Sequence, residues 1–218
     1  MRRKWLLISL SAVVLLPVLV IVAVLVFVSV SDLTQHRDVI AEQVSNVLGR
    51  QLALDGELEL NLGGTTSFVV SDISLANAAW ASEADLLAIQ RIEAEIRIMP
   101  LLRGDIQIPR FHVTGVDASL ETDADGQSNW VLVDPDAPHP ASEDTGAPTG
   151  LKLPWVGDLS ISDVEIVYLD AGSGQKVTAT LERANTQWDE PTTPLVIDIA
   201  GQVNEHPVTV DGKLVLPT

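Results

Sequence analysis

Hydrophobic and charged residues alternate strictly in the middle of the chain. Between residues 91 and 98, isoleucine or alanine occupies every second position, and arginine or glutamate occupies the positions between them. Successive side chains of a β-strand point to opposite faces, so this pattern predicts a strand with one apolar face and one charged face. Turn-forming residues follow at 100–104, and the alternation resumes with Ile106 and Ile108. Residues 87–130 are therefore predicted to form a meander of amphipathic strands.

The apolar positions change parity at two points of this meander. The first change follows Pro109, which an edge strand or a bulge tolerates but the middle of a hydrogen-bonded ladder does not. The second change follows Gly115. Upstream, leucine alternates through residues 51–62, and Asp55-Gly56 within this run is either a hairpin turn or a bulge in one longer strand. The alternation therefore extends the predicted sheet toward the N-terminus.

Further amphipathic strands are predicted on both sides of the meander. Residues 68–76 form one strand, and the loop after it contains Trp80, which we interpret as a packing residue. Beyond residue 150, alternating strands continue to the last residues of the sequence, with a turn at 171–174. Because the apolar face continues, we expect this chain to be the first part of a longer β-structure. The apolar side of the 68–76 strand is assigned to Val69, Ile73 and Leu75.

An uncharged and almost wholly apolar run covers residues 5–30. A bilayer core of ~30 Å needs ~20 such residues, so this run is predicted to span a membrane as a tilted helix. The basic residues at 2–4 place the N-terminus in the cytoplasm. A cleaved signal peptide is the alternative, but its apolar region is only ~7–15 residues long, so a retained anchor is favoured. Representative anchor residues are Trp5, Leu15, Pro17 and Phe27.

Two other segments accompany the predicted strands. Residues 33–48 have apolar residues at helical spacing, and Gly49 suits the position after a helix C-terminus. We favour a helix that plugs the end of the β-structure. The alternative is a helix lying on the membrane surface, but its charges are mixed, so the electrostatic case for membrane binding is weak. Residues 134–150 contain four prolines, several acids and no large apolar residue, which predicts a flexible loop.

The composition argues against several function classes. From Asp32 onward, ten basic and thirty acidic residues give a formal charge of −20, which repels nucleic acid and anionic leaflets. The chain has no cysteine, and it contains no nucleophile, phosphate-binding or zinc motif, so neither an enzyme nor a cofactor is expected. The acidic segment Asp123–Asn129 has only part of a calcium loop and is assigned to a hairpin turn at Asp125-Gly126.

Several short motifs follow the apolar run in a fixed order. They are Leu48-Gly49-Arg50, Leu52-x-Leu-x-Gly56, the segment Val70–Asn77, Ala79-Trp80-Ala81, Met99-Pro-Leu-Leu-Arg-Gly104 leading into Ile106-x-Ile108, and Asp125-Gly-Gln-Ser-Asn129-Trp130. In order and spacing over residues 1–133, the chain resembles the N-terminal region of the AsmA family of bacterial envelope proteins. Residues 151–216 resemble the later strand repeats of that family.

The resemblance implies a bridge-like lipid-transfer protein, in which a long sheet curls into a groove whose apolar floor carries acyl chains. The residues agree, because half of each predicted strand is apolar and no long amphipathic helix follows residue 48 to cover that face. A sandwich core usually contains bulky aromatic side chains, and aromatics make up only 4% of this chain. The predicted groove residues are Val69, Ile73, Leu75, Ile92, Ile96, Ile98, Ile106, Ile108, Val116 and Leu120.

The sequence thus predicts a mainly β protein with an elongated, curled antiparallel sheet. Its segments are a cytoplasmic tip and anchor at 1–31, a helix at 32–50, the meander at 51–133, a loop at 134–150 and further strands at 151–218. The expected function is to bind or conduct phospholipid acyl chains in envelope lipid transport and homeostasis, from an inner-membrane anchor with the bulk in the periplasm. The alternative is a structural or assembly factor for outer-membrane proteins, or a subunit of a membrane complex, with a dry β-core. Expected partners are phospholipid, the inner membrane and, in the alternative, other envelope proteins, but not nucleic acid.

Overall fold

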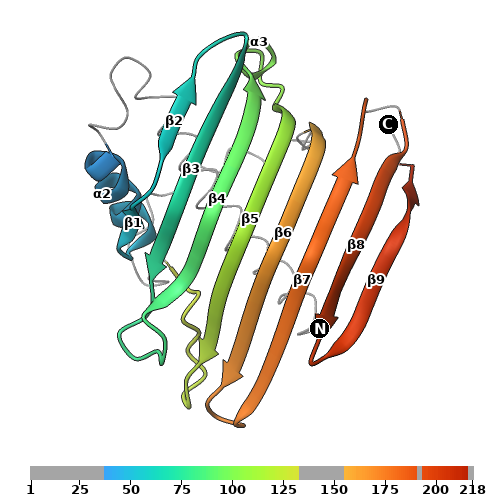
Figure 1. The fold of residues 1–218 in the computed structure, drawn as a ribbon. Coiled ribbons are helices and arrows are strands. Elements are labelled where there is room, and N and C mark those ends of the chain that lie inside the picture. Colours follow the sequence, from blue (N-terminus) through green and yellow to red (C-terminus); the bar gives the residue numbers. More distant parts are fainter. Residues whose placement is uncertain (1–36, 133–154, 191–192, 216–218) are drawn as a thin grey trace, which may run out of the picture.

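A computed structural model describes residues 37–132, 155–190 and 193–215 of the chain. Within them, nine strands form one open, curled sheet that is accompanied by two short helices (Figure 1). The helices are α2 (Arg37–Leu48) and α3 (Ile98–Leu101). The strands are β1 (Leu52–Leu54), β2 (Leu58–Asn61), β3 (Thr65–Ala76), β4 (Asp85–Arg97), β5 (Gln107–Thr122), β6 (Trp155–Asp170), β7 (Gln175–Gln187), β8 (Leu195–Val203) and β9 (His206–Leu214).

The strands follow one another through the sheet nearly in chain order. The order is β1-β3-β4-β5-β6-β7-β8-β9, with β2 also paired to β3, and every pair is antiparallel except β5 with β6. The expectation of a purely antiparallel sheet is therefore wrong, and the sheet is mixed. A parallel neighbour requires the chain to cross back to the end where the previous strand began, and the long connection after Thr122 is able to make that return.

The N-terminal edge of the sheet is one strand with a break in it. Both β1 and β2 run antiparallel to β3, with Leu54 opposite Ile73 and Leu58 opposite Val70. The two pieces are therefore successive parts of one edge, and Gly56 is an extra residue between them. Of the two alternatives for Asp55-Gly56, the bulge within a longer strand is the one that the structure contains.

A line of irregularities crosses strands β3 to β7. Asp72, Gln90, Gly115, Asp163 and Glu182 lie opposite one another in adjacent strands, and at each the inside–outside alternation restarts one residue later. Three of them have positive φ, at 51° for Asp72, 67° for Gly115 and 55° for Asp163. A Cβ atom at Gly115 would collide with the Gln90 side chain, so this position requires glycine. The line keeps the main apolar series of each of these strands on one face along its whole length.

Helix α2 packs on this apolar face, which we call the inner face. Ile40, Val44 and Leu48 of the helix are buried in one cluster with the inner-face residues of β1 to β5, while Val39 and Val47 are exposed. The predicted helix is confirmed, and it ends at Gly49 with a φ of 65°.

Two expectations concern residues that the structure does not describe. The anchor residues Trp5, Leu15, Pro17 and Phe27 and the loop at 134–150 both lie outside the described ranges. Within the described ranges, neither helix has the length and apolar character needed to cross a membrane.

Candidate functional site

The inner face is an apolar floor that continues without interruption across the sheet. Cross-strand register places apolar residues, with single glycine positions, in rows that run from the first strands to β9. One row consists of Leu58, Val70, Ile92, Val113, Ile161, Ala184, Ile199 and Val210. A parallel row consists of Leu54, Ile73, Ile89, Val116, Val164, Leu181, Gly201 and Val208.

Exposure of the floor rises steadily from one side of the sheet to the other. Ile92 in β4 and Val113 in β5 are each 2% exposed. Ile161 in β6 and Ile199 in β8 are half-buried, and Val210 in β9 is 50% exposed. The described strands form a single sheet, so no second sheet among them covers the β6–β9 part of the floor. An apolar surface of this kind fits an apolar ligand or partner.

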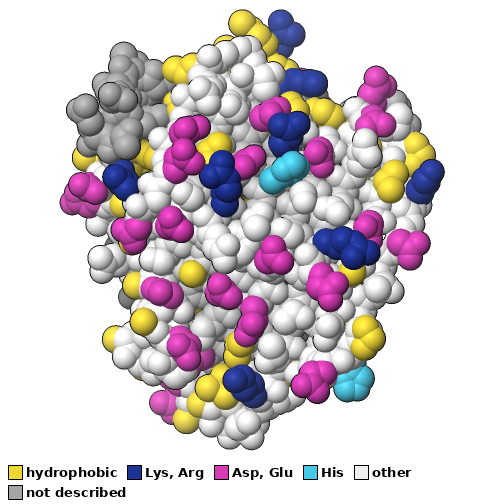
Figure 2. All heavy atoms as spheres, viewed as in Figure 1, with side chains coloured by type: hydrophobic (Ala, Val, Ile, Leu, Met, Phe, Trp, Pro, Cys, Tyr) yellow, Lys and Arg dark blue, Asp and Glu magenta, His cyan; other side chains and the backbone are white. Residues whose placement is uncertain are grey.

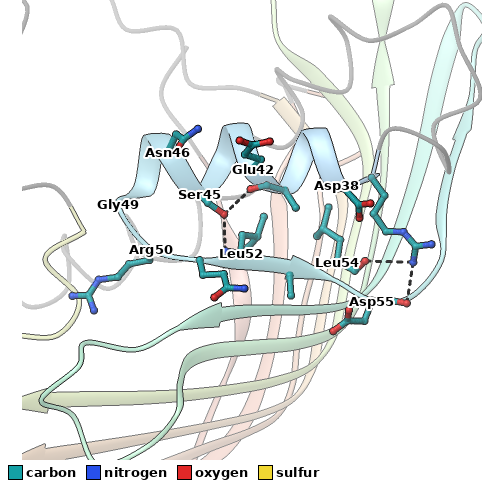
Figure 3. A pocket seen from close by; sticks show the side chains of 13 residues that line it. Asp38, Glu42, Ser45, Asn46, Gly49, Arg50, Leu52, Leu54 and Asp55 are labelled. Atoms are coloured by element: carbon teal, nitrogen blue, oxygen red, sulfur yellow. Dashed lines mark hydrogen bonds between the residues drawn. The ribbon is translucent and has the colours of Figure 1, made fainter.

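The two edges of the sheet differ because α2 closes one of them. The Ser45 hydroxyl accepts a hydrogen bond from the Leu52 amide at 2.8 Å, and the Arg37 guanidinium donates to the backbone carbonyls of Leu54 and Asp55 at 3.4 and 3.1 Å (Figure 3). One outward amide and one outward carbonyl of β1 are thereby hydrogen-bonded to α2. Every residue of β9, at the other edge, is exposed, and none of the described strands pairs with its outer side.

A shallow hollow lies between α2 and β1, beside this closed edge. Figure 3 shows that polar side chains, including Asp38, Glu42 and Asn46, stand around it. Charged and amide groups would be desolvated by an acyl chain placed there. The hollow therefore fits an acyl chain less well than the inner face does.

The opposite, outer face of the sheet carries charge, as the sequence predicted for β4. Acidic and basic side chains are scattered over the strands in Figure 2. Arg91 contacts Glu93 at 2.6 Å and Glu57 at 3.2 Å, and Arg110 contacts Glu95 at 2.8 Å. The hydrogen bond from Arg91 lowers the pKa of Glu93 below its ordinary value. One face of the sheet is thus apolar and the other is hydrated.

Replacing Arg91 with glutamine is expected to raise the pKa of Glu93 toward its ordinary value, because the hydrogen-bonding cation is removed. The stabilisation that Glu93 gains from Arg91 is present at neutral pH and is lost as the pH falls through the lowered pKa. An NMR titration of the Glu93 carboxyl carbon measures the change. The matched control is Arg183→Gln, whose partner Asp198 is on another strand pair; a Glu93 pKa unchanged by Arg91→Gln would contradict the assignment.

A buried polar cluster fixes the end of the sheet opposite α3. Asn129 is fully buried; its side-chain oxygen accepts the Glu121 amide at 2.8 Å, and its nitrogen donates to Asn77 Oδ1 at 2.9 Å and the Ser119 carbonyl at 2.8 Å. The buried carboxylate of Glu121 accepts the amide and hydroxyl of Ser82 at 3.0 and 2.8 Å. These groups satisfy one another, so the cluster has a structural role.

The segment Asp123–Asn129 forms a hydrogen-bonded turn. The Asp123 carboxylate accepts the backbone amides of Asp125 and Gln127 at 2.9 and 2.8 Å, and Gly126 has a φ of 84°. Across the described ranges, no three His, Asp or Glu side chains gather where they could hold a metal ion.

Most of the predicted groove residues lie on the inner face, and Val69 does not. Val69 is opposite Glu59 and Glu93, so it belongs to the outer face, and its assignment is corrected. The reason is the irregularity at Asp72, which shifts the alternation between the two halves of β3. The predicted residues that are buried on the inner face are Ile73, Leu75, Ile92, Ile96, Val116 and Leu120.

The other three predicted groove residues lie near the connection between β4 and β5. Ile98 is half-buried and begins α3, so the strand ends one residue before it. Ile106 precedes β5 and is 44% exposed, whereas Ile108 is half-buried and packs against the core. The last two therefore contribute little to the centre of the floor.

Two features of the sheet were not predicted from the sequence. Phe68 and Val70 of β3 are inner-face residues, and only the tendency of Asp72 to adopt positive φ signalled the change of parity. The polar cluster around Asn129 was also missed, because residue spacing does not show which loop amide will be buried. Glycine at position 115 was a usable signal, and the parity change assigned there is confirmed.

The family comparison covers almost the whole chain. A model of the AsmA family matches residues 1–215. A search of curated proteins found no match to the chain. The single open, curled sheet and its continuous apolar face agree with the fold that the resemblance implies. The chain is therefore a member of the AsmA family.

Proposed function

We propose that this protein binds phospholipid acyl chains on the inner face of its sheet and conducts them along it, as part of envelope lipid transport. The observation that carries the proposal is the unbroken apolar floor, buried at β4 and increasingly exposed toward β9. Membership of the AsmA family is consistent with an envelope role related to lipids. Burial of each methylene group is worth ~0.8 kcal/mol, so several of them retain a chain without polar recognition. This is a function of binding, and we propose no catalysis.

The proposal includes a location. The apolar run at residues 5–30 would anchor the protein in the inner membrane, with the basic N-terminus in the cytoplasm and the sheet in the periplasm. The anchor gives the floor a nearby source of lipid. The structural or assembly role remains the second candidate, and the open edge of β9 favours it, since an exposed strand edge can pair with a partner strand.

Photocrosslinking from two positions of β8 tests the function. Ile199 lies on the floor, and Val196 lies on the outer face of the same strand, opposite Gln187 and Lys213. A benzoylphenylalanine residue at Ile199 should crosslink labelled phospholipid in native membranes, and one at Val196 should not. Both positions are partly exposed, so the fold should tolerate each replacement. Phospholipid adducts from neither position, or equally from both, would contradict the groove, and protein adducts from Ile199 would favour the assembly role.

A further inference from the structure

The end of the sheet that carries α3 has an exposed apolar rim. Leu62, in the turn between β2 and β3, is 62% exposed, and Met99, Leu102 and Ile106, in the connection between β4 and β5, are 63%, 75% and 44% exposed. The two segments are neighbours, because the Ile98 amide donates to the Gly64 carbonyl at 3.1 Å. Exposed apolar residues are ordinary when scattered, but a cluster on adjacent turns indicates an interaction surface. We call residues 61–64 and 98–106 the α3 rim.

The α3 rim, together with the residue that precedes it, carries more basic than acidic side chains, whereas the chain as a whole is acidic. Arg103 is exposed within it and Asp105 is half-buried within it. Arg97, which directly precedes the rim in the chain, lies over the Trp155 ring at 5.0 Å. Figure 2 shows hydrophobic and basic side chains together at this end of the molecule. The turns at the opposite end carry the acids Glu83, Asp123, Asp125, Asp170 and Glu205 beside one base, Lys176. The exposed apolar residues at that end are Trp80, Val131 and Val203. Of these two ends, the α3 rim is the one whose exposed apolar residues lie beside more basic than acidic groups, which suits phospholipid headgroups and their glycerol layer.

Helix α2 begins nearer to the α3 end of the sheet than it ends. Its first residue, Arg37, contacts the backbone of residues 54–56 at mid-sheet, and its last turn lies at the end opposite α3. The chain therefore enters α2 from the α3 side. The six residues between the apolar run and Arg37 reach at most about 20 Å when extended, so the end of that run lies within about this distance of Arg37.

We propose that the α3 rim rests on the phospholipid bilayer that holds the apolar N-terminal run, with Met99 and Leu102 among the headgroups and Arg103 beside the phosphates. This surface rests on the proposed membrane anchor. It orients the sheet, because the acidic turns of the opposite end and the acidic outer face are held away from anionic lipid. The inner-face ends of β4 and β5 then lie beside the bilayer.

A single-cysteine experiment on the full chain tests the contact, and the natural absence of cysteine makes the labelling specific. Leu102→Cys and, in the turn at the opposite end, Ala124→Cys are each labelled with an NBD fluorophore and reconstituted into phosphatidylethanolamine–phosphatidylglycerol vesicles. Both positions are exposed, so neither change disturbs packing. Doxyl-labelled phospholipid should quench the fluorophore at Leu102 severalfold more than the one at Ala124. Adding Arg103→Glu should reduce the quenching at Leu102.

The possible results separate the rim from the anchor. If the protein floats with the vesicles and neither fluorophore is quenched, or Ala124 is quenched instead, the rim proposal is wrong while the anchor and the groove stand. If the protein does not float with the vesicles, the anchor is wrong, and the rim proposal falls with it. Phospholipid crosslinking at Ile199 is measured independently and decides the groove in either case.

Discussion

Replacing Ile92 with lysine should destabilise the sheet by about 4 kcal/mol or more, since a buried cation without a partner adds to the lost apolar packing. Ile92 is 2% exposed on the inner face and lies between Val70 and Val113 in register. A lysine there has no route to water short of opening the cluster formed by α2 and strands β1 to β5. Urea unfolding of the detergent-solubilised protein, followed by tryptophan fluorescence, measures the loss.

The control substitution, Val69→Lys, uses the same new side chain on the neighbouring strand. Val69 faces outward between Glu59 and Glu93, so a lysine there meets water and two carboxylates and should change the stability by less than about 1 kcal/mol. The comparison therefore tests the assignment of faces as well as the burial. Equal losses for the two variants would show that the alternation in β3 is the one inferred from the sequence and that the irregularity at Asp72 is misplaced.

This pair of variants also shows what the sequence can and cannot determine. Strict alternation in residues 91–98 was enough to predict the two faces of β4, because each side chain has only two possible directions in a strand. One residue in αL conformation reverses that choice for the rest of the strand. Gly115 marks such a point by its residue type, whereas aspartate adopts positive φ only occasionally, so Asp72 is a weaker signal of the same change.

Sheet topology was less predictable than the strands themselves. Antiparallel pairing was assumed throughout, yet β5 and β6 are parallel. The length of the segment after Thr122 was compatible with a crossover, but length permits a parallel pair without requiring one. Which arrangement forms depends on the match between the β5 and β6 floors, in which Val113 meets Ile161 and Val116 meets Val164. Such matches are a property of the assembled sheet.

The gradient of burial across the floor has a consequence for function. Near α2 the inner-face residues pack against other side chains of the protein, and toward β9 they contact progressively fewer of them. A protein that only needed a stable core would not need rows of apolar residues extending to an open edge. Ile92 and Ile199 occupy one row, but a charged substitution is expected to have different effects at the two positions. At Ile92 it should destabilise the fold, and at Ile199 it should weaken ligand binding.

The second large effect is expected at Asn129, whose replacement by alanine should cost about 3 kcal/mol, since buried hydrogen-bonding groups at Glu121 and Ser119 lose their partner. Trp130 follows in the chain and contacts Tyr168 with ring centroids 6.0 Å apart, so its fluorescence reports unfolding of this end of the sheet. The control substitution Ser128→Ala leaves the side-chain amide of Asn129 in place and should alter the free energy of unfolding by less than about 0.5 kcal/mol.

A third variant, Asn129→Asp, separates the amide's hydrogen bonds from its volume. An aspartate keeps the shape and the oxygen that accepts the Glu121 amide, but its second oxygen would face Asn77 Oδ1 and the Ser119 carbonyl, both of which are acceptors. Burial and these neighbours favour the protonated acid, so its pKa in the folded state is raised. Stability should therefore be greatest at low pH and decline as the pH rises through that pKa. A pH-independent loss equal to that of Asn129→Ala would mean that packing volume, and not hydrogen bonding, is what this residue supplies.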